Sequence, residues 1–239
     1  MITDNNSSSA IDSKQSTITH HPSPVTPSCR VMVRDVAWLA DEDAFGRHLP
    51  FVSAERRQKA LRFKFPMGRA LSLGAALLLD EMLQAYGLRE LEQQYIIGEH
   101  GKPSLASHPE LHFSLSHSGH YVACALGSSE LGVDIQHQVK VNAGVVRRVC
   151  SEAEIAWLGA QDEAGRAVGF LRLWSLKESW FKAVGTGLTD DYPYFDLTGS
   201  SPLLLNKEGS FRFFEFAFGE GRGALCLPEG DIQPEIITQ

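Results

Sequence analysis

A helix that mixes aromatic and charged side chains is predicted by Trp174-Ser175-Leu176-Lys177-Glu178-Ser179-Trp180-Phe181-Lys182. Residues three and four apart share one face of a helix, so these aromatic and charged residues fall along one side. The helix should end in Gly185-Thr186-Gly187-Leu188, because glycine accepts the left-handed backbone of a C-terminal cap. Taken alone, Glu178 and Lys182 form an i,i+4 surface pair, which contributes only about 0.3–0.5 kcal/mol.

Asp134, upstream of this helix, is a candidate metal ligand. In Leu131-Gly132-Val133-Asp134-Ile135-Gln136, alternation with period two puts three branched residues on an apolar face and Asp134 and Gln136 on the other. Burying a charge costs several kcal/mol unless the charge is paired or coordinates a metal. Mg²⁺ binds oxygen ligands, typically carboxylates together with substrate phosphates and waters. We therefore expect Asp134 to be a Mg²⁺ ligand.

Four motifs in this order resemble those of the Sfp-type 4′-phosphopantetheinyl transferases. Gly101-Lys102-Pro103 comes first, Phe113-Ser114-Leu115-Ser116-His117-Ser118 second, Gly132-Val133-Asp134 third, and residues 174–182 last. A short motif can occur by chance, whereas an ordered set at suitable spacing rarely does. The resemblance runs from about residue 53 to about residue 188, and more loosely to the C-terminus.

This resemblance implies a reaction and its partners. The family transfers the phosphopantetheine arm of coenzyme A to a serine of an apo acyl carrier or peptidyl carrier protein, with Mg²⁺, and releases 3′,5′-ADP. Carriers of fatty-acid, polyketide and nonribosomal peptide synthesis all remain open as substrates.

The resemblance also implies the catalytic residues. Asp134 and Glu178 would hold Mg²⁺, Glu178 would also act as the base, and Lys182 would neutralise charge on the leaving group. Many relatives have a third acidic ligand where this chain has Gln136, so Gln136 would ligate the metal weakly or hold a ligating water.

A set of coenzyme A contacts is implied in the same way. The helix capped by Ser53 matches the family helix that holds the 3′-phosphate, and the turn at residues 101–103 borders the nucleotide pocket. A serine and a histidine at a strand end contact the phosphates, and Lys177 is predicted as a further phosphate contact. The predicted set is Arg56, Lys59, Arg69, Lys102, Pro103, Ser116, His117, Lys177 and Lys182. Without the resemblance, the basic residues are a solvated helical face and Lys102 is an ordinary turn lysine.

The order of elements predicts an α+β protein. A hairpin is expected over residues 112–126, and long helices over residues 69–86 and 167–184, one in each half. The fold that the resemblance implies is a pseudo-dimer of two similar α+β halves, with the active site in the cleft between them.

The expected division is a disordered tail at 1–30, an N-terminal half at 31–126 and a C-terminal half at 127–239. The tail assignment rests on its Ser, Thr, Asn and Pro content. A capping box is predicted at Ser151-Glu152-Ala153-Glu154. The last strand is expected to end at Cys226 and Leu227, and a short polar tail to follow.

Composition narrows the class of protein. Hydrophobic content of 43% and charged content of 21% fit a soluble globular protein. The net charge of -7 argues against a general nucleic-acid binder. The four cysteines form no C-x-x-C pair, and we find neither a signal-peptide pattern nor a membrane-length apolar run. We therefore expect a cytoplasmic protein with no membrane or nucleic-acid partner, for which a monomer is sufficient.

Two other functions stay open. One is a Mg²⁺-dependent coenzyme A or nucleotide hydrolase that uses Asp134 and Glu178 to activate water. The other is a non-catalytic nucleotide-binding module. The hydrolase would cleave coenzyme A without any carrier, and the binding module would be indifferent to Glu178→Gln.

Overall fold

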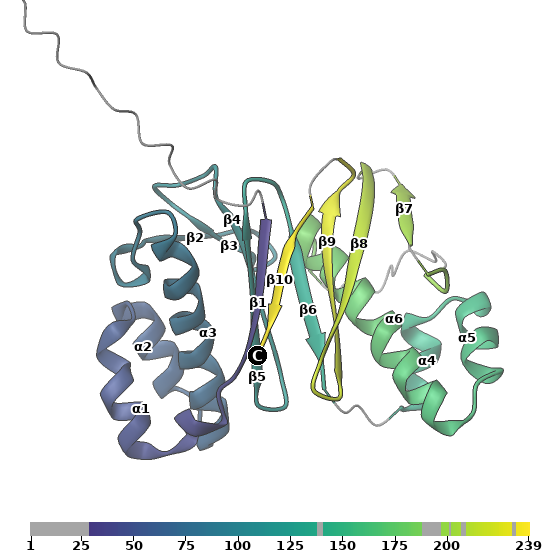
Figure 1. The fold of residues 1–239 in the computed structure, drawn as a ribbon, viewed down its shortest axis with the longest axis horizontal. Coiled ribbons are helices and arrows are strands. Elements are labelled where there is room, and N and C mark those ends of the chain that lie inside the picture. Colours follow the sequence, from purple (N-terminus) through teal and green to yellow (C-terminus); the bar gives the residue numbers. More distant parts are fainter. Residues whose placement is uncertain (1–28, 138–140, 188–196, 201, 207–208, 231–232) are drawn as a thin grey trace, which may run out of the picture.

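The structure is a computed structural model that describes residues 29–137, 141–187, 197–200, 202–206, 209–230 and 233–239 of the 239-residue chain. The expected tail at 1–30 lies outside the described residues apart from Cys29 and Arg30, which begin the first strand. Leu188, at the end of the signature stretch, also lies outside them. Two central sheets flanked by helices make up the fold (Figure 1), which is a mixed α+β architecture as predicted.

The first sheet has four strands in the order β10-β1-β5-β4. Its strands are β1 (Cys29–Asp35), β4 (His112–Ser118), β5 (Tyr121–Gly127) and β10 (Glu235–Thr238). The predicted hairpin is confirmed, because β4 pairs antiparallel with β5 and Gly119 takes the left-handed backbone between them at φ 62°. β1 ends at Asp35, and a short 3₁₀ helix, Ala37–Ala40, follows.

Three helices cover the outer side of this sheet (Figure 1): α1 (Glu42–His48), α2 (Ala54–Leu61) and α3 (Pro66–Gln84). Ser53 caps α2 as predicted, since its side chain accepts a hydrogen bond from the Arg56 amide. The short 3₁₀ helices Leu49–Phe51 and Glu90–Glu92, and the small pair β2 (Tyr95–Ile97) and β3 (Pro103–Leu105), complete this half.

The second sheet has the order β6-β9-β8-β7. It is formed by β6 (Gly132–Gln136), β7 (Leu203–Asn206), β8 (Gly209–Phe218) and β9 (Gly221–Pro228), beside helices α4 (Ala143–Val149), α5 (Glu152–Gly159) and α6 (Glu163–Val184). The signature helix α6 begins four residues earlier than predicted, because Asp162 caps it by accepting from the Gly165 amide. It ends at Gly185, whose φ of 72° is the predicted left-handed cap.

The apolar residues of β6 and of the position before it fill the space between the two sheets. Leu131, Val133 and Ile135 are fully buried there against Val31 of β1 and Leu225 of β9. Alternation in β6 therefore works as predicted. The apolar face points into this core, and the face with Asp134 points away from it.

The expected polar tail after Leu227 is wrong in part. Residues 235–238 form β10, which pairs in parallel with β1 and so returns the C-terminal part of the chain to the first sheet. The Glu235 carboxylate lies 2.7 Å from Nε of Arg30, and Ile236 and Ile237 are half-buried. The strand is only four residues long and lies in a polar context, so periodicity did not reveal it.

Among the described residues, no helix is both long enough and apolar enough to cross a membrane.

Candidate active site

A pocket of about 290 Å³ lies where the signature helix meets the N-terminal half. Its lining comes from α2, the turn before β3, β4, and the C-terminal end of α6. The lining residues are Arg56, Lys59, His100, Gly101, Lys102, Pro103, Phe113, Ser114, Leu115, Glu178, Phe181, Lys182, Gly185 and Gly187. A second pocket of about 330 Å³ adjoins it along α2 and shares Arg56, Lys59, Gly101 and Pro103. Three of the four predicted motifs thus contribute residues to one pocket.

Gly132 explains how the fourth motif reaches this place. A Cβ atom at Gly132 would overlap the Ser179 carbonyl oxygen and the Ala183 amide nitrogen, both in the backbone of α6. Only glycine therefore allows β6 to lie directly against the helix. This close approach brings Asp134, two residues on, to the side of Lys182.

Asp134 is 3% exposed and accepts hydrogen bonds from three side chains. Its Oδ1 lies 2.8 Å from the Ser116 hydroxyl and 2.7 Å from Lys182 Nζ. Its Oδ2 accepts from Nε2 of Gln136 at 2.7 Å. The carboxylate is buried and its charge is paired, which is the arrangement that a buried anion requires.

Arg56 is held at the pocket wall by a buried acid that sequence reasoning missed. Its guanidinium lies 4.6 Å from the centre of the Tyr95 ring, and its Nε is 3.6 Å from Oε1 of the fully buried Glu90. Glu90 also accepts from the Ser53 amide, the Ser53 hydroxyl and the Tyr95 hydroxyl. Nothing in the local sequence marks Glu90, because its partners lie on other elements.

The basic residues beside Arg56 belong to the same pocket. Lys59 lines it, and desolvation together with the charge of Arg56 lowers the pKa of Lys59. Lys102 also lines it and donates to the Ala183 carbonyl at 2.7 Å, which ties the predicted turn to the end of α6. Pro103 lines both pockets.

Ser116 and His117 lie on opposite faces of β4. The Ser116 side chain is buried against β6, where it contacts Asp134. Desolvation, and then the positive charge of Lys182, lower the pKa of His117. His117 is therefore electrostatically close to the pocket lysines, whereas Ser116 faces the seam between the two sheets.

Lys177, a predicted phosphate contact, is buried in an ion pair away from the pocket. Its side chain is 2% exposed, and its Nζ donates to the Glu154 carboxylate at 2.7 Å and to the Val149 carbonyl at 2.6 Å. Glu154 closes the predicted capping box with Ser151, which is confirmed, and also accepts from the Leu197 amide. Lys177 does not line the pocket, because the helix turns it towards α5 and the buried Glu154 binds its charge.

Arg69 also lies apart from the pocket residues. Its Nη1 is 3.1 Å from a Glu42 carboxylate oxygen, and its Nε donates to the Phe63 carbonyl at 3.1 Å. It lines neither of the two adjoining pockets. In this structure Arg69 joins α3 to α1 and to the preceding loop.

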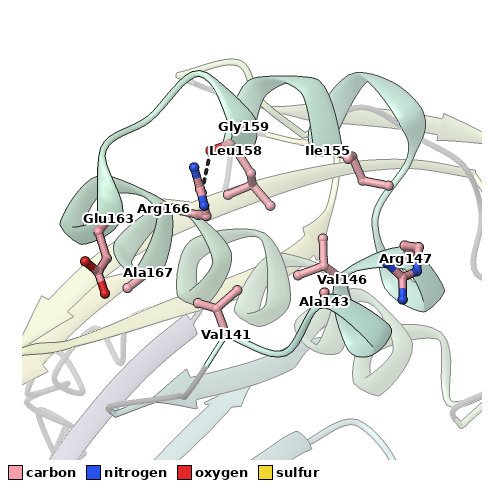
Figure 2. Close-up of a pocket in the computed structure, with 10 residues that line it drawn as sticks. All are labelled: Val141, Ala143, Val146, Arg147, Ile155, Leu158, Gly159, Glu163, Arg166 and Ala167. Carbon is pink, nitrogen blue, oxygen red and sulfur yellow. Dashed lines mark hydrogen bonds between the residues drawn. The ribbon is translucent and has the colours of Figure 1, made fainter.

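A larger pocket of about 700 Å³ lies at the other end of α6 (Figure 2). It is formed by α4, α5 and the first turns of α6, with Val141, Val146, Ile155 and Leu158 along its apolar part. Helix geometry places Glu163, its one lining carboxylate, about 20 Å from Glu178. None of the residues that line this larger pocket belongs to the four predicted motifs.

The donor set beside the smaller pocket fits a magnesium ion in chemical type. Asp134 and Glu178 supply carboxylate oxygens, whereas Gln136 presents its amide nitrogen Nε2, not its oxygen, to Asp134. Within the described part of the chain, no group of three or more His, Cys, Asp and Glu side chains could hold a metal ion. Further oxygens would have to come from Gln136, water or a bound phosphate, which is how Mg²⁺ is commonly held.

Comparison with known proteins gives this site a family. The family model of the 4′-phosphopantetheinyl transferase superfamily (ACPS) matches residues 130–222, which include Asp134 and the whole of α6. The 4′-phosphopantetheinyl transferase Sfp of Bacillus subtilis is 35% identical over 145 residues, or 60% of this chain and 64% of that protein. The chain thus matches a little under two thirds of the length of this relative.

Two fungal relatives match over more of their length. The L-aminoadipate-semialdehyde dehydrogenase-phosphopantetheinyl transferase of Saccharomyces cerevisiae is 29% identical over 84% of this chain and 80% of that protein. The 4′-phosphopantetheinyl transferase pptA of Paxillus involutus is 31% identical and matches 79% of this chain and 82% of that protein. The signature helix lines the pocket, the Gly132-Val133-Asp134 strand lies directly against that helix, and the chain belongs to the 4′-phosphopantetheinyl transferase family.

Proposed function

We propose that this protein transfers the 4′-phosphopantetheine arm of coenzyme A to a serine hydroxyl of an apo acyl or peptidyl carrier protein and releases 3′,5′-ADP. One observation carries the proposal. The pocket combines three basic residues of the N-terminal half, Arg56, Lys59 and Lys102, with Glu178 and Lys182 of the signature helix. A cationic wall facing an acidic residue suits a substrate that is a polyanion and must also lose a proton.

Binding of coenzyme A rests on the basic wall. Arg56 and Lys59 would hold the 3′-phosphate, and Lys102 and Pro103 would border the nucleotide. A phosphate near Lys59 would favour its charged form, which desolvation disfavours in the free protein. His117, whose pKa is lowered for the same reason, would gain a proton or donate its N–H when phosphates bind.

Asp134 and Glu178 would hold a magnesium ion from a strand and from a helix, with Gln136 as a weak ligand or the holder of a ligating water. This ion, when bound, supplies charge neutralisation at the pyrophosphate. The carboxylates of Asp134 and Glu178 support the assignment, and Gln136, which now donates Nε2 to Asp134, would have to turn its amide oxygen towards the ion.

The chemistry of the chain's own residues follows from the weakness of a serine nucleophile. Glu178 would take the proton of the carrier serine as its Oγ attacks the phosphorus next to pantetheine. The bond from that phosphorus to the oxygen of 3′,5′-ADP breaks at the same centre. Lys182 would stabilise the charge that develops on this oxygen, and its 30% exposed side chain lies within reach of both Asp134 and the pocket.

We take the chain to work as two α+β halves, 31–126 and 127–239, arranged as a pseudo-dimer with the site in the cleft between them, although β10 of the second segment completes the sheet of the first. The lining of the pocket by residues of both segments supports this proposal. Because one chain would then supply both halves, a monomer suffices. We place the activity in the cytoplasm, with which four free, buried cysteines agree.

Intact-protein mass spectrometry tests the proposal. Apo carriers of fatty-acid, polyketide and nonribosomal peptide synthesis are incubated with coenzyme A and the protein, with Mg²⁺ or with excess chelator. We expect the carrier to gain the mass of phosphopantetheine when Mg²⁺ is present and not when chelator is in excess. This mass gain should be lost in Asp134→Ala and Glu178→Gln. Glu163→Gln, which removes a carboxylate at the remote end of the same helix, should keep the activity. Cleavage of coenzyme A with no mass gain on any carrier would favour the hydrolase instead.

A further inference from the structure

The two sheets meet along β4 and β6, which are the end strands of their respective sheets. Three serines of β4 at alternate positions accept hydrogen bonds from alternate amides of the facing chain. The pairs are Val133 N–H to Ser114 Oγ (3.1 Å), Ile135 N–H to Ser116 Oγ (3.3 Å) and His137 N–H to Ser118 Oγ (2.9 Å). We call this contact the serine seam.

The serine seam supplies hydrogen-bond acceptors to amides at the edge of a sheet. Amides along the edge of a sheet need acceptors when they are buried. Here side-chain hydroxyls supply these acceptors, and the constant spacing holds the two strands in a fixed parallel register. The seam therefore fixes how the N-terminal half sits relative to Asp134.

Ser116 makes one bond that the other two serines of the seam are not seen to make. Its hydroxyl oxygen accepts from the Ile135 amide, and its proton is donated to Oδ1 of Asp134 at 2.8 Å. Both side chains are buried, Ser116 at 6% and Asp134 at 3% exposure. A serine hydroxyl has a single proton, so Ser116 cannot donate to Asp134 and to a phosphate at the same time.

We propose that Ser116 is a positioning residue that orients the Asp134 carboxylate, and that it is not a ligand of coenzyme A. This inference rests on the proposed function. The three donors to Asp134 come from β4, β6 and α6, and only the donor from β4 belongs to the opposite sheet. The orientation of the Asp134 carboxylate therefore depends on the register of the serine seam. Through the seam it also depends on the position of the N-terminal half, which carries the basic residues of the pocket.

Ser116→Ala is compared with Ser118→Ala to test this. Ser118→Ala also removes a seam bond, but its bond is to the His137 amide. For each variant, kcat, KM for coenzyme A and, in the absence of carrier, the Kd for Mn²⁺ by electron paramagnetic resonance are measured. Ser116→Thr, which keeps a hydroxyl, serves as the rescue variant.

We expect Ser116→Ala to weaken Mn²⁺ binding and to lower kcat, each by about 10–100-fold, the usual effect of losing a partner behind a metal ligand. KM for coenzyme A should stay unchanged, Ser118→Ala should behave as the wild type, and Ser116→Thr should recover Mn²⁺ binding.

Two results would overturn the inference. One is a KM for coenzyme A raised about tenfold or more in Ser116→Ala with unchanged Mn²⁺ binding, as expected for a lost hydrogen bond to a charged phosphate. The other is an equal loss of Mn²⁺ affinity in Ser118→Ala, which would make the seam a purely structural contact. A wild-type protein that modifies no carrier would refute the proposed function, whereas the Mn²⁺ affinities would still decide the role of Ser116.

Discussion

Replacing Lys177 with methionine should destabilise the protein strongly and leave coenzyme A binding intact. The ammonium group lies 2.7 Å from Glu154 in a site where the two side chains are 2% and 0% exposed. Methionine has a similar length and no charge, so it removes the partner of Glu154 with little change in volume. Among the described residues, the donors that remain to the Glu154 carboxylate would then be the amides of Ser151 and Leu197.

The size of the effect follows from leaving one buried charge uncompensated. Removing one partner of a buried ion pair costs about 3–5 kcal/mol. For a chain of this size, each kcal/mol shifts Tm by about 2–4 °C, so Lys177→Met should lower Tm by about 6–20 °C. Glu154→Gln should also destabilise, since Lys177 would then keep the Val149 carbonyl but lose its counter-charge.

Urea titrations measure the free energy of unfolding, and the m-value, its dependence on urea concentration, is compared between variants. Isothermal titration calorimetry measures coenzyme A binding. Lys59→Met is the matched control, because Lys59 lines the pocket and its side chain is exposed. It should weaken coenzyme A binding without a comparable loss of stability. A stable Lys177→Met that binds coenzyme A about tenfold more weakly would refute the argument, since a phosphate contact gives that pattern.

Three further changes test the structural account. Gly132→Ala should lower the free energy of unfolding by about 1–3 kcal/mol or more in urea titrations, because its Cβ overlaps the Ser179 carbonyl; an unchanged value would mean that β6 does not lie against α6. Partial desolvation of the exposed His117 and the charge of Lys182 lower the pKa of His117, so the folded state binds fewer protons than the unfolded state near the ordinary pKa. Stability should therefore fall as pH drops through that range, and His117→Gln should flatten the fall in thermal unfolding followed from pH 8 to pH 5; parallel profiles would contradict this. Deleting β10 should lower Tm, since β1 loses its parallel partner; an unchanged Tm would show that this pairing contributes nothing.

Much of the fold could be predicted because its signals are local. Alternation in β6 separated Asp134 from the core residues, and the serine at residue 53 marked the start of α2. Gly185 marked the end of α6 for an equally local reason, the left-handed cap. The four ordered motifs predicted the residues of the site, because each motif places a particular residue type at the end of a particular element.

The remaining features depend on contacts between segments far apart in the chain. Lys177 pairs with Glu154, 23 residues away, and Ser116 bonds to Asp134, 18 residues away. No periodicity encodes such a pairing. The side chain of Lys177 points towards α5 because of its position around the axis of α6, and there it pairs with the buried Glu154. Arg69 was predicted by motif match alone, and no local pattern indicates that its side chain lies beside Glu42 of α1.

The most direct test of the central claim is the stoichiometry of the reaction. Holo-carrier is quantified by intact mass and 3′,5′-ADP by chromatography in the same sample, with and without apo carrier. The account predicts one 3′,5′-ADP for each phosphopantetheinylated serine, neither product without carrier, and loss of both in Glu178→Gln. Release of 3′,5′-ADP in the absence of carrier, at the rate seen in its presence, would contradict it and identify the protein as a hydrolase.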